Sequence, residues 1–355
     1  NIQYFVEKVA EDALNKHNAD SVSIAVMNPN NGEILGMVNK PGFNPNNPYE
    51  GSEAFKGKDE SAKLQNMWRN TIASDAFEPG SIFKIITSIA AIEENIAGKD
   101  EVYYCDGSLN VAGKNIKCWK PGGHGVQNFN QTLENSCNVA FMEMGAKLGA
   151  EKLNEYIKLF GFGTQSGIDL PGEATGIVKN VEDISAVDLA TISFGQTNTM
   201  NGIQFMTALN AVANGGDLIQ PHIMKELSHK DDNGTKIIDE VFVPKIQENI
   251  VDEKSTMRVK EALESTVSNG SSKDAGIEGI KVAGKTGTAE KVDPETGTYG
   301  AGYIASFAGF APYDNPQVSL IVIIDNPKNG EHFGGIVAAP FAGELFNNIF
   351  NYCLL

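Results

Sequence analysis

The feature that most constrains the fold of this chain is an apolar run close to its C-terminal end. Every residue from Val318 to Ile324 except Ser319 is aliphatic, and Asp325 closes the run. A strand that carries apolar side chains on both of its sides needs cover on both faces of its sheet. The sequence therefore predicts a central, doubly covered strand here.

Further strand patterns lie at the two ends of the chain, whereas the middle is mainly helical. Strands are predicted at about 22–26, 33–38, 279–289, 302–311 and 317–325. Helical patterns prevail from Ser81 to about Asn214, interrupted by an excursion at 103–128 that contains Gly and Cys residues. Strands from both ends of a chain around a helical middle predict an α+β fold, in which helices cover an antiparallel sheet and a second subdomain is all helical.

We expect one domain over residues 1–355. Its sheet subdomain comprises about 1–80 and 216–355, and its mainly helical subdomain comprises about 81–215. Residues 1–6 already read as an amphipathic helix, and no run approaches the roughly 20 apolar residues of a membrane-spanning helix. The net charge of −17 repels nucleic acid and anionic lipid. This argues against a nucleic-acid partner and against other functions that depend on binding phosphate groups.

The segment around Ser81 has the features of an activated nucleophile. Pro79 and Gly80 are typical of a helix entrance, and the apolar run after Lys84 has helical length, so Ser81 is predicted in the first turn of a helix. Three residues are about one helical turn, which places the amine of Lys84 on the same face as the hydroxyl of Ser81. A lysine can take the proton of a hydroxyl if burial or another cation lowers its pKa.

Two further segments strengthen the interpretation of Ser81 and Lys84 as a catalytic pair. Ser136 and Asn138 place a hydroxyl and an amide two residues apart. Lys285, Thr286, Gly287 and Thr288 follow a short strand-like run, in which the glycine leaves room for a ligand to lie against the backbone. The chain thus contains, in this order, the S-x-x-K, serine–asparagine and K-T-G motifs of β-lactamases and penicillin-binding proteins.

With these motifs, the chain resembles the transpeptidase domain of class B, monofunctional penicillin-binding proteins. Segments along most of its length also look like that family: Trp68 to Asn70, Gly167 to Glu173, Phe194 to Gln196, Ala211 to Gly216, Ala305 to Pro312 and Gly334 to Pro340. The run from Tyr104 to Asn138 is most similar to the elongation and sporulation-type enzymes of Gram-positive spore formers. The resemblance implies the penicillin-binding and serine β-lactamase type of fold.

The resemblance also implies a reaction and a role for each motif residue. Ser81 would attack the penultimate D-alanine of a peptidoglycan stem peptide, Lys84 would take its proton, and Ser136 would relay a proton to the leaving D-alanine. Asn138 would bind the peptide and help to hold Lys84, while Lys285 would favour the neutral amine of Lys84 and attract the substrate carboxylate. That carboxylate would bind Thr286 and Thr288, and the N–H groups of Ser81 and Thr288 would form the oxyanion hole.

The family resemblance also implies the ligands, the protein partner and the cellular location. The expected ligands are stem peptides and β-lactam antibiotics, the acyl chemistry needs no cofactor, and a membrane glycosyltransferase of the elongation or sporulation machinery is the expected protein partner. The expected location is the extracytoplasmic face of the cell membrane, with an N-terminal anchor and a non-catalytic pedestal outside this sequence.

Three cysteines and a histidine are clustered in the excursion and the segment after it. Cys105, Cys118, His124 and Cys137 match the Cys₃His ligand set of a structural zinc site, although their spacing is not that of a zinc finger or ribbon. The alternative is a disulfide between Cys105 and Cys118 with Cys137 left as a buried free thiol. The sequence leaves both open.

Two other functions remain as alternatives. A serine β-lactamase shares the acyl-enzyme chemistry but must also activate a water molecule, and the segments outside the motifs favour a penicillin-binding protein. A β-lactam sensor or a non-catalytic wall-binding scaffold belongs to a different functional class, and the complete motif set argues against a silent scaffold. Labelling with a penicillin and a test for cross-linking distinguish these possibilities.

Overall fold

A five-stranded antiparallel sheet forms the centre of the protein, for which the computed structural model describes residues 1–293 and 296–353. Its strands are, in spatial order, β11 (Ala283–Val292), β12 (Tyr299–Ala311), β13 (Val318–Asp325), β1 (Ser21–Met27) and β2 (Ile34–Lys40). Strand β13 lies in the middle of the sheet and pairs with β12 and β1. The predicted α+β class and the central strand are therefore confirmed.

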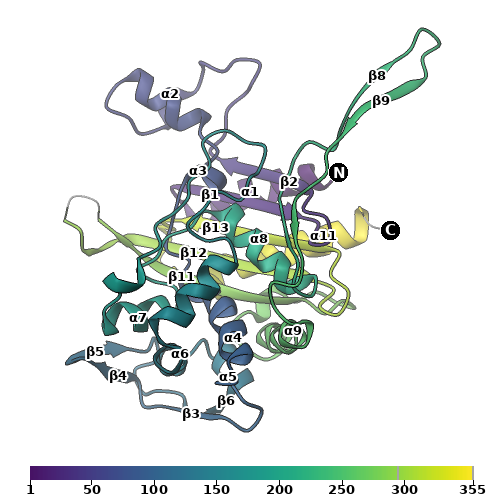
Figure 1. The fold of residues 1–355 in the computed structure, drawn as a ribbon. Helices are drawn as coiled ribbons and strands as arrows, with labels where there is room; N and C mark the ends of the chain where they lie inside the picture. The colour runs from purple at the N-terminus through teal and green to yellow at the C-terminus, as the bar shows by residue number, and fades with distance from the viewer. Residues whose placement is uncertain (294–295, 354–355) are drawn as a thin grey trace.

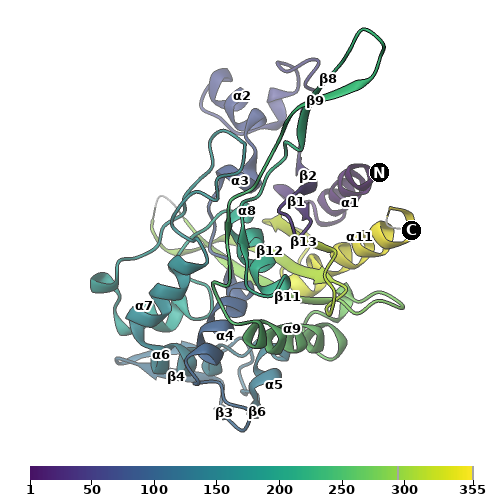
Figure 2. The ribbon, with the colours of Figure 1, turned by 45° about the vertical axis from the view of Figure 1, so that its right-hand side comes forward.

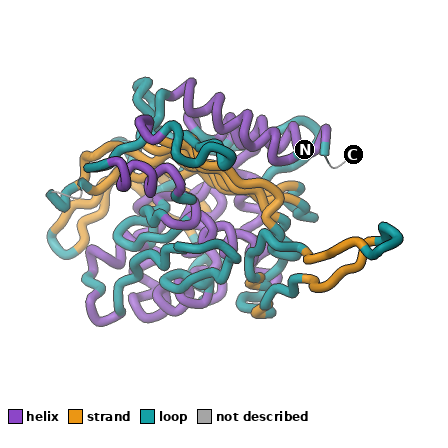
Figure 3. Tube along the Cα trace, turned by 90° about the horizontal axis from the view of Figure 1, so that it is seen from above, coloured by secondary structure: helices purple, strands orange, loops and turns teal. Residues whose placement is uncertain are grey.

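Helices cover both faces of this sheet (Figures 1 and 2). Alternate side chains of β13 enter different cores: Leu320 and Val322 pack with α1 (Ile2–His17) and α11 (Ala339–Tyr352), whereas Ile321 packs on the opposite face with α8 (Gly202–Ala213). Figure 3 shows the strands as a layer between these two sets of helices. The near-continuous apolar run of β13 follows from this double cover.

The helical part of the chain lies beside the face that α8 covers. Its central element is α4 (Lys84–Glu93), which is buried over most of its length and packs against α6 (Asn138–Leu159) and α9 (Glu253–Ser268). The remaining helices are α2 (Glu60–Trp68), α3 (Thr71–Ser74), α5 (Phe129–Glu134), α7 (Ala186–Ile192) and α10 (Gly334–Val337), with short 3₁₀ helices η1 (Ser52–Ala54), η2 (Gly80–Phe83), η3 (Val181–Asp183) and η4 (Lys273–Ala275).

In the described ranges, four pairs of short strands form small two-stranded sheets outside the central sheet. They are β3 (Val102–Cys105) with β6 (Gly125–Asn128), β4 (Ser108–Val111) with β5 (Lys114–Lys117), β7 (Leu218–Ile219) with β10 (Ile246–Gln247), and β8 (Glu226–Lys230) with β9 (Lys236–Val241). The hairpin of β8 and β9 projects far from the sheet, at the upper right of Figure 1. Among the described residues, no helix combines the length and the apolar character that crossing a membrane requires.

Candidate active site

Ser81 lies in the 3₁₀ helix η2, directly before α4 begins at Lys84. The sequence placed Ser81 in the first turn of the α-helix itself, so the structure shifts the start of α4 by one turn. Gly80 has a positive φ of 58° and donates its N–H to the carbonyl of Gly195 at 2.8 Å. Gly195 also has a positive φ, and a Cβ atom there would overlap the carbonyl oxygen of Gly80. The chain before Ser81 is thus fixed by a backbone contact that only glycine permits at position 195.

The amine of Lys84 is fully buried and joins the first two motifs. Its Nζ lies 3.0 Å from Ser81 Oγ, 2.8 Å from the carbonyl oxygen of Ser136, 3.2 Å from Ser136 Oγ and 2.8 Å from Asn138 Oδ1. Ser136 reaches this position in a left-handed turn (φ 49°) between α5 and α6. Asn138 is the first residue of α6. Residues more than fifty positions apart in the chain therefore surround one amine.

Burial lowers the pKa of Lys84 to about 8, while the nearby thiols of Cys137 and Cys118 act in the opposite direction. An amine with this pKa is partly neutral near neutral pH, so it can accept a proton from a hydroxyl that it contacts. The resemblance implied that the charge of Lys285 would favour the neutral amine of Lys84. Burial is instead the cause.

Lys285 is also fully buried, and its Nζ donates to the carbonyl oxygen of Thr286 at 3.1 Å. Burial, and secondarily the charge of Lys84, holds the pKa of Lys285 well below its ordinary value. The charge of Lys84 thus disfavours the charged form of Lys285.

The third motif lies on β11, whose residues Lys285 to Thr288 pair with Ala308 to Ala305 of β12. A Cβ atom at Gly287 would lie 2.9 Å from the carbonyl oxygen of Pro79, so the strand passes close to the nucleophile segment because this position has no side chain. Thr288 Oγ1 accepts a hydrogen bond from the N–H of Gly334 at 2.9 Å.

A cleft of about 370 Å³ contains the exposed ends of the three motifs. Ser81, Ser136, Asn138, Thr286 and Thr288 line it. Its walls also contain residues that the sequence did not identify as site residues: Trp119, Gly270, Ser271, Lys273, Asp274, Phe333 and Ile336. Trp119 and Ile336 lie within segments that resemble the family, Tyr104 to Asn138 and Gly334 to Pro340, whereas the segment 270–274 had no such signal.

The predicted cysteine and histidine cluster is also brought together. The Sγ atoms of Cys105, Cys118 and Cys137 and a ring nitrogen of His124 all lie within 4.8 Å of one another, and the three cysteines are free and buried. Cys118 Sγ lies 3.7 Å from His124 Nδ1, whereas His124 Nε2 is buried without a hydrogen-bond partner.

The donor set and its dimensions fit a zinc ion. Zinc–ligand bonds of about 2.0–2.3 Å place the ligand atoms of a tetrahedral site roughly 3.3–3.8 Å apart, which the present spacing reaches with a small contraction. The hydrogen bond from Cys137 lowers the pKa of Cys118 to about 4, so this pair already favours a thiolate. A thiolate is the form of cysteine that binds metal.

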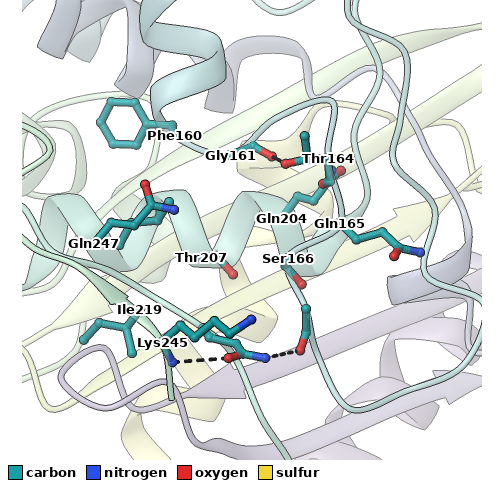
Figure 4. A pocket seen from close by; sticks show the side chains of 13 residues that line it. Phe160, Gly161, Thr164, Gln165, Ser166, Gln204, Thr207, Ile219, Lys245 and Gln247 are labelled. Atoms are coloured by element: carbon teal, nitrogen blue, oxygen red, sulfur yellow. Dashed lines mark hydrogen bonds between the residues drawn. The ribbon is translucent and has the colours of Figure 1, made fainter. Parts of the chain in front are cut away.

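A second cavity, of about 250 Å³, lies apart from these motifs between α8, β7, β10 and the loop after α6 (Figure 4). Two amide side chains of its lining form hydrogen bonds within the fold. Gln204 Nε2 donates to the carbonyl oxygens of Thr164 and Thr175, and Gln220 Nε2 donates to that of Gly167. None of the predicted site residues lines this cavity.

Comparisons with known proteins agree with this arrangement. Residues 22–350 match the family described as the penicillin-binding protein transpeptidase domain. The chain is 40% identical over 351 residues to stage V sporulation protein D of Bacillus subtilis, covering 98% of this chain and 52% of that protein. It is 30% identical over 361 residues to penicillin-binding protein PbpB of Mycobacterium tuberculosis, covering 98% and 50%. The chain thus spans about half the length of these curated relatives.

Solved structures show the same fold. Penicillin-binding protein 3 of Mycobacterium tuberculosis in complex with aztreonam has a TM-score of 0.84 and 28% identity, with 99% of this chain and 77% of that chain covered. The apo transpeptidase domain of penicillin-binding protein 3 from Burkholderia pseudomallei has a TM-score of 0.81 and 26% identity, with 99% and 93% covered.

Proposed function

The chain belongs to the transpeptidase family of penicillin-binding proteins, and from this premise we propose that it is a peptidoglycan D,D-transpeptidase. It cross-links stem peptides through an acyl-enzyme on Ser81 and is acylated by β-lactams at the same atom. The observation that carries this proposal is the buried amine of Lys84 in contact with Ser81 Oγ, Ser136 Oγ and Asn138 Oδ1.

In the acylation step, the neutral amine of Lys84 takes the proton of Ser81 while Ser81 Oγ attacks the carbonyl carbon of the penultimate D-alanine. The peptide bond to the terminal D-alanine breaks, and its nitrogen receives a proton through Ser136. The contacts of Lys84 Nζ with both hydroxyl groups support this route. The products are an ester on Ser81 and free D-alanine.

In the second step, an amine of a neighbouring stem peptide attacks the ester carbonyl. A new amide bond forms, the bond to Ser81 Oγ breaks, and the proton lost by the amine returns to Ser81 Oγ through Lys84. The energetics of both steps depend on the oxyanion. We assign its stabilisation to the backbone N–H groups of Ser81 and Thr288, for which the loss of one donor typically costs about 2.7–4 kcal/mol.

Strand β11 supplies the binding groups for the substrate carboxylate. The hydroxyl groups of Thr286 and Thr288 line the cleft, and Gly287 permits the close approach of the strand. Lys285 lies buried next to this position, so its ammonium form attracts the carboxylate from below the cleft surface. Binding of that carboxylate favours the charged form of Lys285 and thereby the neutral form of Lys84.

Cys105, Cys118, His124 and Cys137 hold a structural zinc ion in this proposal, although the acyl chemistry needs no cofactor. When bound by these four residues, a zinc ion would tie the segment 105–124 to Cys137, which lies between Ser136 and Asn138. The four ligand atoms within 4.8 Å and the unpartnered His124 Nε2 support this assignment. Metal affinity then contributes to the local folding free energy of the active-site loop.

The remaining assignments concern the whole protein. Residues 1–355 form one transpeptidase domain, with a sheet subdomain of about 1–80 and 216–355 and a helical subdomain of about 81–215. The name of the Bacillus subtilis relative supports a role in sporulation. We place the protein on the extracytoplasmic face of the membrane, held by an N-terminal anchor, with a membrane glycosyltransferase of the elongation or sporulation machinery as its partner.

The test combines labelling with cross-linking. A fluorescent penicillin should label the protein stably, Ser81→Ala should abolish the label, and the wild-type protein should join two stem peptides with release of D-alanine. Rapid loss of the label with turnover would instead indicate a serine β-lactamase. Stable labelling without cross-linking would indicate a sensor, and no labelling at all would indicate a non-catalytic scaffold.

A further inference from the structure

The residues before Ser81 lie against the loop between α7 and α8. The N–H of Phe77 donates to the carbonyl oxygen of Met200 at 3.0 Å, and the N–H of Met200 donates to that of Phe77 at 3.0 Å. Closer to the nucleophile, the N–H of Gly80 donates to the carbonyl of Gly195. The position of the segment that carries Ser81 therefore depends on this loop.

The side chain of Glu78 adds a further contact with the same loop. Glu78 Oε1 accepts a hydrogen bond from the N–H of Thr197 at 2.7 Å. Thr197 has a φ of 75°, which is unfavourable for a residue with a branched Cβ, so its surroundings must hold it there. Its hydroxyl lies 2.7 Å from that of Thr191. The carboxylate of Glu78 thus helps to hold a strained turn beside the segment that carries the nucleophile.

The same carboxylate also binds the strand pair β11–β12. Tyr299, the first residue of β12, pairs with Val292 at the end of β11, and its hydroxyl lies 3.1 and 3.2 Å from the two carboxylate oxygens of Glu78. Burial, and secondarily the charge of Glu78, raises the pKa of the Tyr299 hydroxyl, which therefore keeps its proton and donates it. Over residues 1–293 and 296–353, this is the only hydrogen-bonded link between residues 77–81 and β11 or β12.

The other contacts between these two parts are packing contacts of the backbone. A Cβ atom at Gly287 would lie 2.9 Å from the carbonyl oxygen of Pro79, and one at Gly80 would lie 3.0 Å from that of Thr288. Glu78 itself does not line the cleft. It can therefore influence the reaction only through the position of the segments that it joins.

We propose that Glu78 is a positioning residue for the oxyanion hole. It joins the segment that carries the N–H of Ser81 to the strand pair that carries the N–H of Thr288. This role rests on the proposed function, because the oxyanion arises only when an acyl group is transferred. Both donors must meet one oxygen at hydrogen-bond distance in the transition state, so a shift between the two segments weakens the transition state more than it weakens ligand binding.

Three variants separate the parts of this link. Glu78→Ala removes the carboxylate, Glu78→Gln retains an acceptor oxygen of the same reach, and Tyr299→Phe removes only a hydroxyl from a side chain that is 45% exposed. Tyr156→Phe is the matched control. The hydroxyl of Tyr156 also donates to a glutamate, Glu94, at 3.1 Å, and neither residue lines the cleft.

The measurements separate binding from chemistry. Stopped-flow kinetics with benzylpenicillin give the dissociation constant of the non-covalent complex and the first-order rate constant of acylation. Phenylacetamidomethylboronic acid examines the oxyanion hole directly: its boron forms a bond to Ser81 Oγ, the hydroxyl proton passes to Lys84, and the tetrahedral adduct has no leaving group. Thermal unfolding reports on the fold of every variant.

Glu78→Ala should lower the first-order acylation constant about 10- to 100-fold and weaken inhibition by the boronic acid by a similar factor. The dissociation constant for benzylpenicillin should change by less than about threefold. Tyr299→Phe should slow acylation about 3- to 10-fold, and Glu78→Gln should react faster than Glu78→Ala. Tyr156→Phe should stay within about twofold of the wild type.

A double variant tests whether Tyr299 acts through Glu78. In the Glu78→Ala background, Tyr299→Phe should slow acylation by less than about twofold further, because the partner of the hydroxyl is already absent. If Glu78→Ala does not fold, Tyr299→Phe alone decides: slower acylation with an unchanged dissociation constant supports the positioning role, and an unchanged rate overturns it.

Other outcomes would also overturn the positioning role. They are unchanged acylation constants in Glu78→Ala and Tyr299→Phe, a loss confined to the dissociation constant, a full effect of Tyr299→Phe in the double variant, or an equal loss in Tyr156→Phe. The proposed function survives each of them. Failure of every penicillin to acylate the wild-type protein would instead overturn the proposed function, and the role of Glu78 with it.

Discussion

The amine of Lys84 lies 3.0 Å from the hydroxyl oxygen of Ser81, in a position where the lysine is completely buried. Burial disfavours the ammonium form, and the groups around the amine are hydroxyl, amide and carbonyl oxygens rather than carboxylates. A lysine in these surroundings can serve as a base, and the first two predictions depend on this relationship.

Lys84→Arg should nearly abolish acylation, because arginine retains the positive charge but cannot lose its proton in a protein. We expect a decrease of about 10²- to 10⁴-fold in the acylation rate, the range typical of removing a general base. Stopped-flow measurement with a fluorescent penicillin gives the rate, and thermal unfolding reports on the fold. Lys260→Arg is the matched control, since Lys260 is a buried lysine that donates to the carbonyl of Ala213, outside the cleft. An acylation rate in Lys84→Arg close to that of Lys260→Arg would exclude the base role.

The acylation rate should rise with pH and level off above about pH 8. The base must be neutral, and burial lowers the pKa of Lys84 to about 8 in the folded protein. The same shift opposes folding at low pH: the unfolded chain binds more protons than the folded one between about pH 8 and the ordinary lysine value, so stability rises with pH across that window. A rate with benzylpenicillin that is constant between about pH 6 and pH 9 would contradict this assignment.

Gly195→Ala should destabilise the protein by at least about 2 kcal/mol and impair acylation. Gly195 has a φ of 95°, and a Cβ atom there would overlap the carbonyl of Gly80, the residue before Ser81. Gly113→Ala is the control, because Gly113 has a similar φ of 83° and no atom within 4 Å of the added Cβ. Denaturant unfolding of both variants separates the backbone strain from the overlap. Equal destabilisation would mean that the contact with Gly80 is unimportant.

Removal of zinc should lower both the melting temperature and the acylation rate, and added zinc should restore them. The proposed ligands Cys118 and Cys137 fix the segment that presents Ser136 and Asn138, so loss of the metal loosens that motif. Elemental analysis of the purified protein should give one zinc per chain. A protein free of metal, with a disulfide between Cys105 and Cys118 in the mass spectrum and insensitivity to chelator, would exclude the zinc site.

Local pattern was sufficient to predict part of the fold. The apolar run ending at Ile324 predicted the central position of β13, because a strand that is covered on both faces has apolar residues at nearly every position. The three-residue spacing of Ser81 and Lys84 predicted their contact. The same reasoning placed Ser81 inside the α-helix rather than in η2, since local propensities do not resolve a one-turn difference at a helix start.

The rest of the site depends on contacts that no local pattern encodes. Lys84 meets Asn138 across 54 positions, and the resemblance to a known family, rather than periodicity, supplied that expectation. Trp119, Lys273 and Asp274 reach the cleft from an excursion and a short 3₁₀ segment, whose positions are set by tertiary packing. Their residue types carry no spacing signal, so the sequence alone did not single them out.

The most direct test of the account is the identity of the residue that penicillin acylates. The protein is treated with benzylpenicillin, digested, and the modified peptide is located by tandem mass spectrometry. We expect one adduct, on Ser81, in a stoichiometry of one per chain, and no adduct in Ser81→Ala. An adduct on Ser136 with Ser81 unmodified would contradict it.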